Sequence, residues 1–295
     1  MVLRETSVIS ISTTHAGPRI CVFFFFFFFF FFFFFFSYYF LYSVHLSVRR
    51  GAGLPPLVQF IEGLQRINHQ PPGHAGAKMG VALSQGSQES LTRAFTMLLD
   101  PEDSLLVEAP TYSGSLAYLR PLGCHLAAIA TDGHGAVPED LERLLTQWHT
   151  LFPTRRKPRV IYTVPTGSNP TGGSLTVERR QRLYRLAQVH DLLILEDDPY
   201  YYLQFQPKRL PSLLSLDVDG RVLRFDSFSK ILSSGLRLGW VTGPAPLVDQ
   251  LCLHTQVGPA PLVDQLCLHT QVGRSHPPVW PQSGRNYPIM QALRI

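Results

Sequence analysis

The alternation of apolar and polar positions divides the middle of the chain into predicted strands and helices. Short apolar runs bounded by polar or turn-forming residues predict strands. They are residues 104–110, 125–130, 159–164, 192–196, 222–225 and 236–243. Residues 138–145 open on a proline and two acids, and residues 174–191 place Leu183, Leu186 and Ala187 on one face, so both predict helices. Apolar strands separated by helices favour an α/β fold in which helices cover both faces of a mostly parallel sheet.

Polar residues follow three of these predicted strands. Asn169 lies in a turn-rich loop after residues 159–164, Asp197 directly follows the next strand, and Lys230 comes shortly after residues 222–225. Ligands of open α/β sheets bind beyond the carboxyl ends of the strands, so we expect an amide, a carboxylate and an amine to face one crevice. Taken singly, each residue is more often part of a turn, a helix cap or a solvated loop.

The N-terminal segment differs from the rest of the chain. Phenylalanine fills every position from Phe23 to Phe36, and the apolar segment around this run extends over residues 22–42. A length of about 20 residues is enough to span a bilayer, and Arg49 and Arg50 would then favour a cytosolic C-terminal side. The alternative is low-complexity sequence without an evolved role. We therefore expect a membrane anchor only if residues 22–42 insert.

The C-terminal end also departs from ordinary patterning. Residues 243–257 recur unchanged as residues 258–272. Two copies are too few for a solenoid, so a recent duplication or an assembly error is the simpler interpretation. After Gly273 the tail is irregular and rich in proline and polar residues, which predicts no regular element.

Composition narrows the classes of function. With 295 residues, of which 45% are hydrophobic, the chain can bury a core of ordinary size. The net charge of +5 is spread along the chain, and the densest basic cluster, at residues 155–159, is short, so no nucleic-acid partner is expected. The four cysteines show no CxxC spacing, which indicates neither a metal site nor a disulfide framework and is typical of a reducing compartment.

An ordered set of motifs carries a resemblance to a known family. The motifs are GSQESL at 86–91, EAPTYSG at 108–114, PTGSNPTG at 165–172, EDDPYYYLQF at 196–205 and DSFSKILSSGLRLGW at 226–240. In order and spacing they resemble the fold-type I pyridoxal-phosphate (PLP) aminotransferases, and within these the aminoadipate/kynurenine aminotransferase group. The resemblance implies the large PLP-binding domain of that family, an α/β domain built on a mostly parallel sheet flanked by helices.

The resemblance also defines the expected domain organisation. Residues 1–50, with the phenylalanine run, match nothing in the family; residues 51–257 correspond to the PLP-binding large domain; residues 258–295 hold the second copy of the duplication and the tail. The small C-terminal domain, which in this family carries an arginine for the substrate carboxylate, is largely missing from the match. Because such a clamp orients the substrate, its loss would impair turnover more than cofactor binding.

The resemblance implies a role for each residue of the expected site. Lys230 would form an imine with the PLP aldehyde and would later move a proton at the substrate α-carbon. The phosphate would be bound at a helix N-terminus and by an arginine with nearby hydroxyls. The residues concerned are Ser87, Gln88, Ser227, Ser229 and Arg237.

The remaining implied roles concern the pyridine ring. Asp197, chosen over Asp198 because Tyr200 then lies three residues on, would pair with the protonated ring nitrogen and keep the ring electron-withdrawing. Asn169 and Tyr200 would hydrogen-bond the 3-oxygen of the ring. Tyr112 would stack on the ring, or else is an ordinary core aromatic. No metal is expected.

Two functions stay open at this point. One is a PLP-dependent aminotransferase of amino-acid metabolism. It would move an amino group from an L-amino acid such as aminoadipate or kynurenine to a 2-oxo acid, as a homodimer in the cytoplasm or the mitochondrial matrix. The other is a catalytically impaired PLP-binding remnant or splice-type variant, membrane-tethered through the phenylalanine run. The ordered motifs favour the first function, and the two unmatched ends favour the second.

Overall fold

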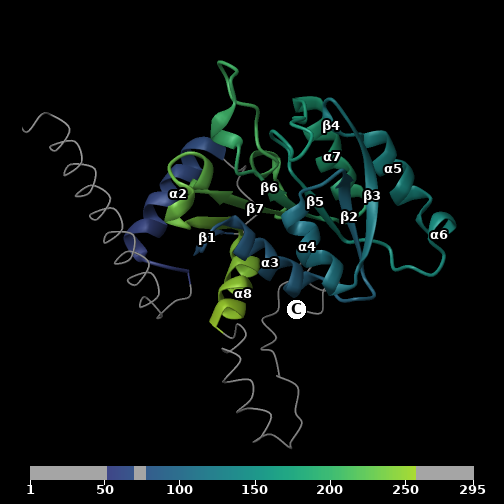
Figure 1. The fold of residues 1–295 in the computed structure, drawn as a ribbon, viewed down its shortest axis with the longest axis horizontal. Coiled ribbons are helices and arrows are strands. Elements are labelled where there is room, and N and C mark those ends of the chain that lie inside the picture. Colours follow the sequence, from purple (N-terminus) through teal and green to yellow (C-terminus); the bar gives the residue numbers. More distant parts are fainter. Residues whose placement is uncertain (1–51, 70–77, 257–295) are drawn as a thin grey trace, which may run out of the picture. The chain divides into compact units, whose positions relative to one another are not determined.

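The computed structural model describes residues 52–69 and 78–256. In this part of the chain, helices cover both faces of one eight-stranded sheet (Figure 1). In chain order the strands are β1 (Met79–Ser84), β2 (Ser104–Ala109), β3 (His125–Asp132), β4 (Gly135–Ala136), β5 (Val160–Thr163), β6 (Leu193–Asp197), β7 (Val222–Ser227) and β8 (Gly239–Pro244). Their order across the sheet is β1-β8-β7-β6-β5-β2-β3-β4.

Most neighbouring strands in this sheet are parallel. The strands from β7 through β6, β5 and β2 to β3 each run parallel to the next. Strand β8 runs antiparallel to both β7 and β1, and the short β4 runs antiparallel to β3. The predicted α/β class with a mostly parallel sheet is confirmed. Because β5, β6 and β7 are adjacent and parallel, their carboxyl ends lie side by side.

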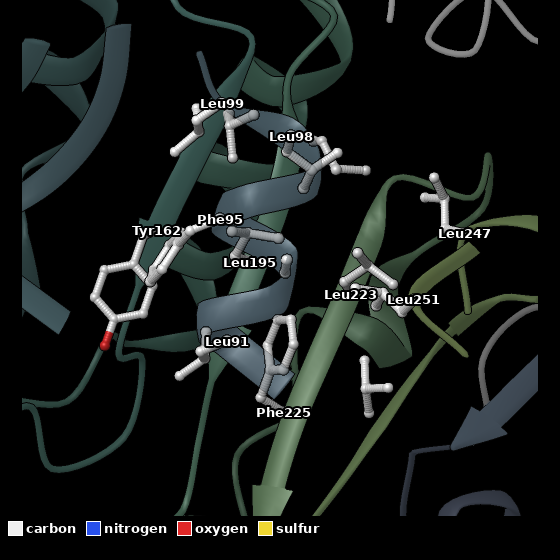
Figure 2. Close-up of a cluster of buried hydrophobic side chains, with 14 of the residues drawn as sticks. Leu91, Phe95, Leu98, Leu99, Tyr162, Leu195, Leu223, Phe225, Leu247 and Leu251 are labelled. Atoms are coloured by element: carbon white, nitrogen blue, oxygen red, sulfur yellow. The ribbon is translucent and has the colours of Figure 1, made fainter. Parts of the chain in front are cut away.

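Two apolar clusters hold the helices against the sheet. The helices are α2 (Pro55–His69), α3 (Ser87–Leu98), α4 (Ser113–Leu122), α5 (Pro138–Thr146), α6 (Trp148–Leu151), α7 (Val177–Val189) and α8 (Ala245–Gln256). Figure 2 shows one cluster, in which Leu91 and Phe95 of α3 pack near Phe225 of β7. The other cluster joins α5, α6 and α7 to the sheet around the fully buried Trp148. Burial of each such side chain contributes roughly 1.5–3 kcal/mol.

The predicted helices form where their sequences indicate. Helix α5 begins at Pro138, whose fixed φ suits a first turn. Helix α7 begins after Thr176, whose hydroxyl accepts a hydrogen bond from the Arg179 N–H at 3.3 Å. This cap explains why the helix begins later than the predicted range of 174–191. Its face of Leu183, Leu186 and Ala187 is buried, as predicted.

One predicted strand boundary is wrong. Residues 236–243 were expected to be extended, but β8 begins only at Gly239. The 3-10 turn Ser234–Leu236 comes before it, and Arg237 has a left-handed φ of 45°. A left-handed residue cannot continue a pleated strand, so the chain turns here before it enters the sheet. Helices α2, α4, α6 and α8 and strands β1 and β4 were not predicted from the sequence.

The predictions for the two ends of the chain lie outside the described residues. Neither the phenylalanine run nor residues 258–295 are described, so the boundaries of the three predicted regions stay predictions. The first copy of the duplication forms the end of β8 and helix α8. Within residues 52–69 and 78–256, no helix has both the length and the apolar character that a membrane span requires.

Candidate functional site

A pocket of about 210 Å³ lies where β5, β6 and β7 end. Every residue predicted for the site lines this pocket. These residues are Ser87, Gln88, Tyr112, Asn169, Asp197, Tyr200, Ser227, Ser229, Lys230 and Arg237. Gly86, Val164, Pro199 and Ser234 complete the lining. The expectation that an amide, a carboxylate and an amine share one crevice is therefore confirmed.

Lys230 lies immediately beyond strand β7. The strand ends at Ser227, whose hydroxyl accepts a hydrogen bond from the Ser229 N–H at 3.1 Å and so begins the 3-10 turn Phe228–Lys230. The two serine hydroxyl oxygens also lie 2.9 Å apart. The Lys230 Nζ lies 5.8 Å from the centre of the Tyr200 ring. The turn thus places an exposed amine beside two hydroxyl groups and an aromatic ring.

The beginning of helix α3 and Arg237 form a positive wall of the pocket. Gly86 precedes the helix with a φ of 88° and provides no side-chain cap, so N–H groups of the first turn are left for another acceptor. A Cβ at Gly86 would lie 2.7 Å from Arg237 Nη2, so a larger residue there would displace the guanidinium. Arg237 also donates to the Gln85 carbonyl oxygen at 3.3 Å. A helix N-terminus beside a guanidinium is a favourable site for a phosphate.

Asp197 is the buried acid of the pocket. It is the last residue of β6, it is only 5% exposed, and its Oδ2 accepts a hydrogen bond from the Tyr162 hydroxyl at 2.8 Å. Its Oδ1 is buried and has no hydrogen-bond partner among residues 52–69 and 78–256. Burial raises the pKa of Asp197 to about 7, the Tyr162 hydrogen bond opposes this rise, and the nearby carboxylates of Asp198 and Asp226 add to it.

The neighbouring Asp198 belongs to a different environment. It does not line the pocket, and its Oδ2 accepts hydrogen bonds from Arg224 at 3.1 Å and Thr166 at 3.2 Å. Arg224 is fully buried and also pairs with Glu196 at 3.1 Å and with Asp226 at 2.8 Å. This placement supports the choice of Asp197 over Asp198 for the site.

A buried glutamate holds the loop that carries Asn169. Glu108, at the end of β2, accepts hydrogen bonds from Thr163 at 2.5 Å and from Ser168 at 3.1 Å. Ser168 directly precedes Asn169, which is exposed at the pocket. Burial raises the pKa of Glu108, while the hydroxyl hydrogen bonds oppose the rise. The loop therefore has a fixed attachment on β2, which lies three strands across the sheet from β7, the strand that Lys230 follows.

Tyr112 lines the pocket wall and is not a core residue. It directly precedes helix α4 and is only partly buried, and a Cβ at Gly114 would lie 2.5 Å from its ring. The core alternative for Tyr112 is therefore wrong, whereas stacking on a ligand stays a prediction. Sequence reasoning missed Val164, Pro199 and Ser234, which flank the motif residues but carry no distinctive chemistry.

The fold and the pocket together define an α/β protein with an anion site next to a lysine and a buried carboxylate. Residues 58–256 match the family described as aminotransferase class I and II, and the chain belongs to this family. It is 44% identical over 219 residues to the mitochondrial kynurenine/alpha-aminoadipate aminotransferase of Bos taurus. That match covers 72% of this chain and 52% of the bovine protein. The corresponding protein of Rattus norvegicus is 45% identical over 224 residues, which cover 74% of this chain and 53% of the rat protein.

Solved structures agree with this assignment. The aminotransferase Aro8 from Candida albicans is 35% identical with a TM-score of 0.64, and the match covers 70% of this chain and 46% of that protein. The kynurenine aminotransferase of Pyrococcus horikoshii, solved in complex with PMP, is 29% identical with a TM-score of 0.67, over 73% of this chain and 52% of that protein. The resemblance to the aminoadipate/kynurenine group is confirmed. The chain spans about half the length of the curated relatives it matches.

Proposed function

We propose that this chain binds PLP in the pocket through Lys230 and takes part in amino-group transfer between an L-amino acid and a 2-oxo acid. The observation that carries the proposal is that Asp197, whose buried Oδ1 receives no hydrogen bond from the described residues, lines the same pocket as Lys230 and Arg237. A buried acceptor without a partner is costly unless a ligand donates to it. A protonated pyridine nitrogen would supply that donor.

The residues present fit the phosphate of PLP as well. The proposed anion site consists of the helix N-terminus at Ser87 and Gln88, the hydroxyls of Ser227 and Ser229, and Arg237. Glycine at position 86 leaves the space that the guanidinium occupies. Together these groups would fix one end of an elongated ligand, while Asp197 would fix the other.

When bound, PLP supplies an aldehyde and an electron-withdrawing ring that stabilises negative charge on a substrate α-carbon. Lys230 would hold that aldehyde covalently. Once released, its amine would take a proton from the substrate α-carbon and return it to the C4′ carbon of the cofactor. Asp197 would hold the proton of the ring nitrogen. Asn169 and Tyr200 would donate to the ring 3-oxygen, and Tyr112 would cover one face of the ring.

The names of the relatives suggest the substrate class. Similarity to kynurenine/alpha-aminoadipate aminotransferases supports an L-amino acid of this kind as amino donor. A homodimer is proposed by analogy with the family. A location in the mitochondrial matrix or the cytoplasm is proposed because the mammalian relatives are named as mitochondrial. The alternative of an impaired PLP-binding remnant is less well supported, since the comparisons return named aminotransferases.

The half-reaction with an amino donor tests the proposed activity. Protein loaded with PLP is mixed with L-kynurenine or aminoadipate in the absence of a 2-oxo acid, and the visible spectrum is recorded. Amino-group transfer predicts that the band of the Lys230-linked cofactor is lost and that a 2-oxo acid restores it. A Lys230-dependent band that no amino acid bleaches would instead support the impaired-binding alternative.

A further inference from the structure

A buried tyrosine, Tyr162, forms a hydrogen bond with Asp197, the buried acid of the pocket. Tyr162 of β5 is fully buried, and its ring packs edge-on against Phe95 with the ring centres 5.5 Å apart. Figure 2 shows the two rings side by side, with the Tyr162 hydroxyl pointing out of the apolar cluster. That hydroxyl lies 2.8 Å from Asp197 Oδ2. Tyr162 does not line the pocket, so any effect on a ligand acts through Asp197.

A serine on the neighbouring helix fixes the direction of this hydrogen bond. Ser115 of α4 is fully buried, and its Oγ donates to the Tyr162 hydroxyl at 3.0 Å. Burial, together with the charge of Asp197, raises the pKa of Tyr162 well above its ordinary value, so the phenol keeps its proton. Since Ser115 already donates to the phenol oxygen, the phenol proton is directed to Asp197. The donors therefore run in sequence from Ser115 through Tyr162 to Asp197.

This chain of donors determines which carboxylate oxygen is left free. Oδ2 accepts the Tyr162 hydrogen bond, while Oδ1 is buried without a partner in the described part of the chain and belongs to a residue that lines the pocket. The orientation of the Asp197 carboxylate is therefore determined by Tyr162 and Ser115, which do not line the pocket. A carboxylate without this anchor would be free to turn about its side-chain torsion.

We propose that Tyr162, supported by Ser115, is a positioning residue that aims Asp197 Oδ1 at the ring nitrogen of the cofactor and keeps Asp197 ionised against it. The inference rests on the proposed function, because it presupposes that PLP occupies the pocket. Ionisation matters because a buried carboxylate that gains basicity would take the proton from the ring nitrogen. The ring would then withdraw electrons less strongly.

The surroundings of Asp197 make this hydrogen bond important. The negative charges of nearby Asp198 and Asp226 disfavour its ionised form, whereas the charge of Arg224 favours that form. Glu108 adds a further carboxylate near Tyr162. Tyr162 donates the one hydrogen bond that Asp197 receives from a described side chain. Loss of a hydrogen bond to a charged group corresponds to a shift of at least about one pKa unit.

The substitution Tyr162→Phe tests the inference in two states of the protein. In the cofactor-free protein, carbon-13 NMR of labelled aspartate side chains follows the ionisation of Asp197, assigned with Asp197→Asn. The midpoint is expected to rise by at least about one unit in Tyr162→Phe. In protein loaded with nitrogen-15 PLP, the ring nitrogen signal is expected to move toward the unprotonated position, and PLP affinity is expected to fall on the order of tenfold.

Two further variants separate positioning from general damage. Tyr184→Phe removes a buried tyrosine hydroxyl that also donates to carboxylates, at Asp217 and Asp219, but Tyr184 does not line or contact the pocket. It is expected to leave both NMR signals unchanged. Ser115→Ala keeps the Tyr162 phenol and weakens only its support, so it is expected to shift both signals in the same direction as Tyr162→Phe by a smaller amount.

The outcomes distinguish this inference from the proposed function. Unchanged Asp197 ionisation and ring nitrogen signals in Tyr162→Phe would overturn the positioning role and leave PLP binding standing. Equal effects of Tyr184→Phe and Tyr162→Phe would also overturn it, because the effect would then be nonspecific. A wild-type protein that forms no Lys230-dependent band with PLP would overturn the proposed function itself, and with it the role of Tyr162.

Discussion

Two adjacent aspartates at the end of β6 lie in opposite kinds of environment. Strand residues alternate between the two faces of a sheet, so Glu196 and Asp198 face Arg224 on one side, while Asp197 faces Tyr162 on the other. Asp198 is held by an arginine that also holds two other carboxylates. Asp197 receives one hydrogen bond from a described side chain and lines the pocket.

The difference separates a structural acid from one available to a ligand. Both aspartates are buried, and burial raises the pKa of each, to about 6 for Asp198 and about 7 for Asp197. Each also has a buried Oδ1 that receives no hydrogen bond from the described residues, so what distinguishes them is that Asp197 lines the pocket, whereas Asp198 is held by Arg224 and Thr166 away from it. An unpartnered buried oxygen costs stability, and only in Asp197 does that oxygen belong to a residue that lines the pocket.

The largest expected change in stability comes from removing Arg224, the arginine that pairs with Asp198. Arg224→Met would leave Glu196, Asp198 and Asp226 without their shared cation, and we expect a loss of about 3–5 kcal/mol in the free energy of unfolding, measured with urea. Arg182→Ala, which removes an exposed pairing with Glu139 and Glu142, is the control and should leave the urea midpoint unchanged. Equal midpoints for the wild type and Arg224→Met would contradict the account.

The raised pKa of Asp197 predicts that the free energy of unfolding depends on pH. Because the pKa of Asp197 rises from 3.8 to about 7 on folding, the folded protein holds a proton that the unfolded chain releases between these values. The stability that this proton contributes is complete below about pH 4 and is lost as the pH rises to about 7.

Asp197→Asn removes this titration and keeps the shape of the side chain. In cofactor-free protein, the variant should gain stability relative to wild type as the pH rises from about 4 to about 7. A pKa shift of about three units corresponds to a change of a few kcal/mol, roughly 4, in the difference between their free energies of unfolding. Asp198, Asp226 and Glu108 also have raised pKa values, so only the difference between the two urea curves isolates Asp197. A difference that does not vary with pH would show that Asp197 ionises normally.

A smaller effect is expected at the aromatic wall of the pocket. Tyr112→Leu removes a ring that would cover the cofactor, and PLP binding should weaken about 2- to 10-fold in a fluorescence titration. Tyr112→Phe keeps the ring and serves as the matched variant, with affinity close to that of wild type. If the leucine variant binds as tightly as wild type, Tyr112 forms the wall without stacking.

The sequence predicted the pocket better than it predicted what surrounds it. Asn169, Asp197 and Lys230 could be placed together because each follows a predicted strand and parallel strands end at one edge of the sheet. Neither the Tyr162 hydrogen bond nor the Arg224 cluster could be predicted. Both depend on strand register, which pairs Tyr162 with Leu195 and Glu196 with Arg224, and apolar runs carry no register information.

Helix α2 was missed for a related reason. Helix α2 keeps Phe60 and Ile67 exposed while it buries Gln65 and His69, so its pattern does not separate an apolar face from a polar one. The buried polar residues are held by tertiary partners, since Gln65 donates to Asp226 and His69 bonds with Ser212 at 2.8 Å. Such contacts override the periodicity on which the prediction of helices rests.

The covalent attachment of PLP to Lys230 is the central claim, and trapping it is the most direct test. Purified protein is incubated with PLP, reduced with borohydride, digested and examined by mass spectrometry, with Lys230→Ala treated in parallel. The account predicts one modified peptide, carrying the phosphopyridoxyl group on Lys230, together with a visible absorbance band that the variant lacks. Modification spread over surface lysines, or a band that persists in Lys230→Ala, would contradict the account.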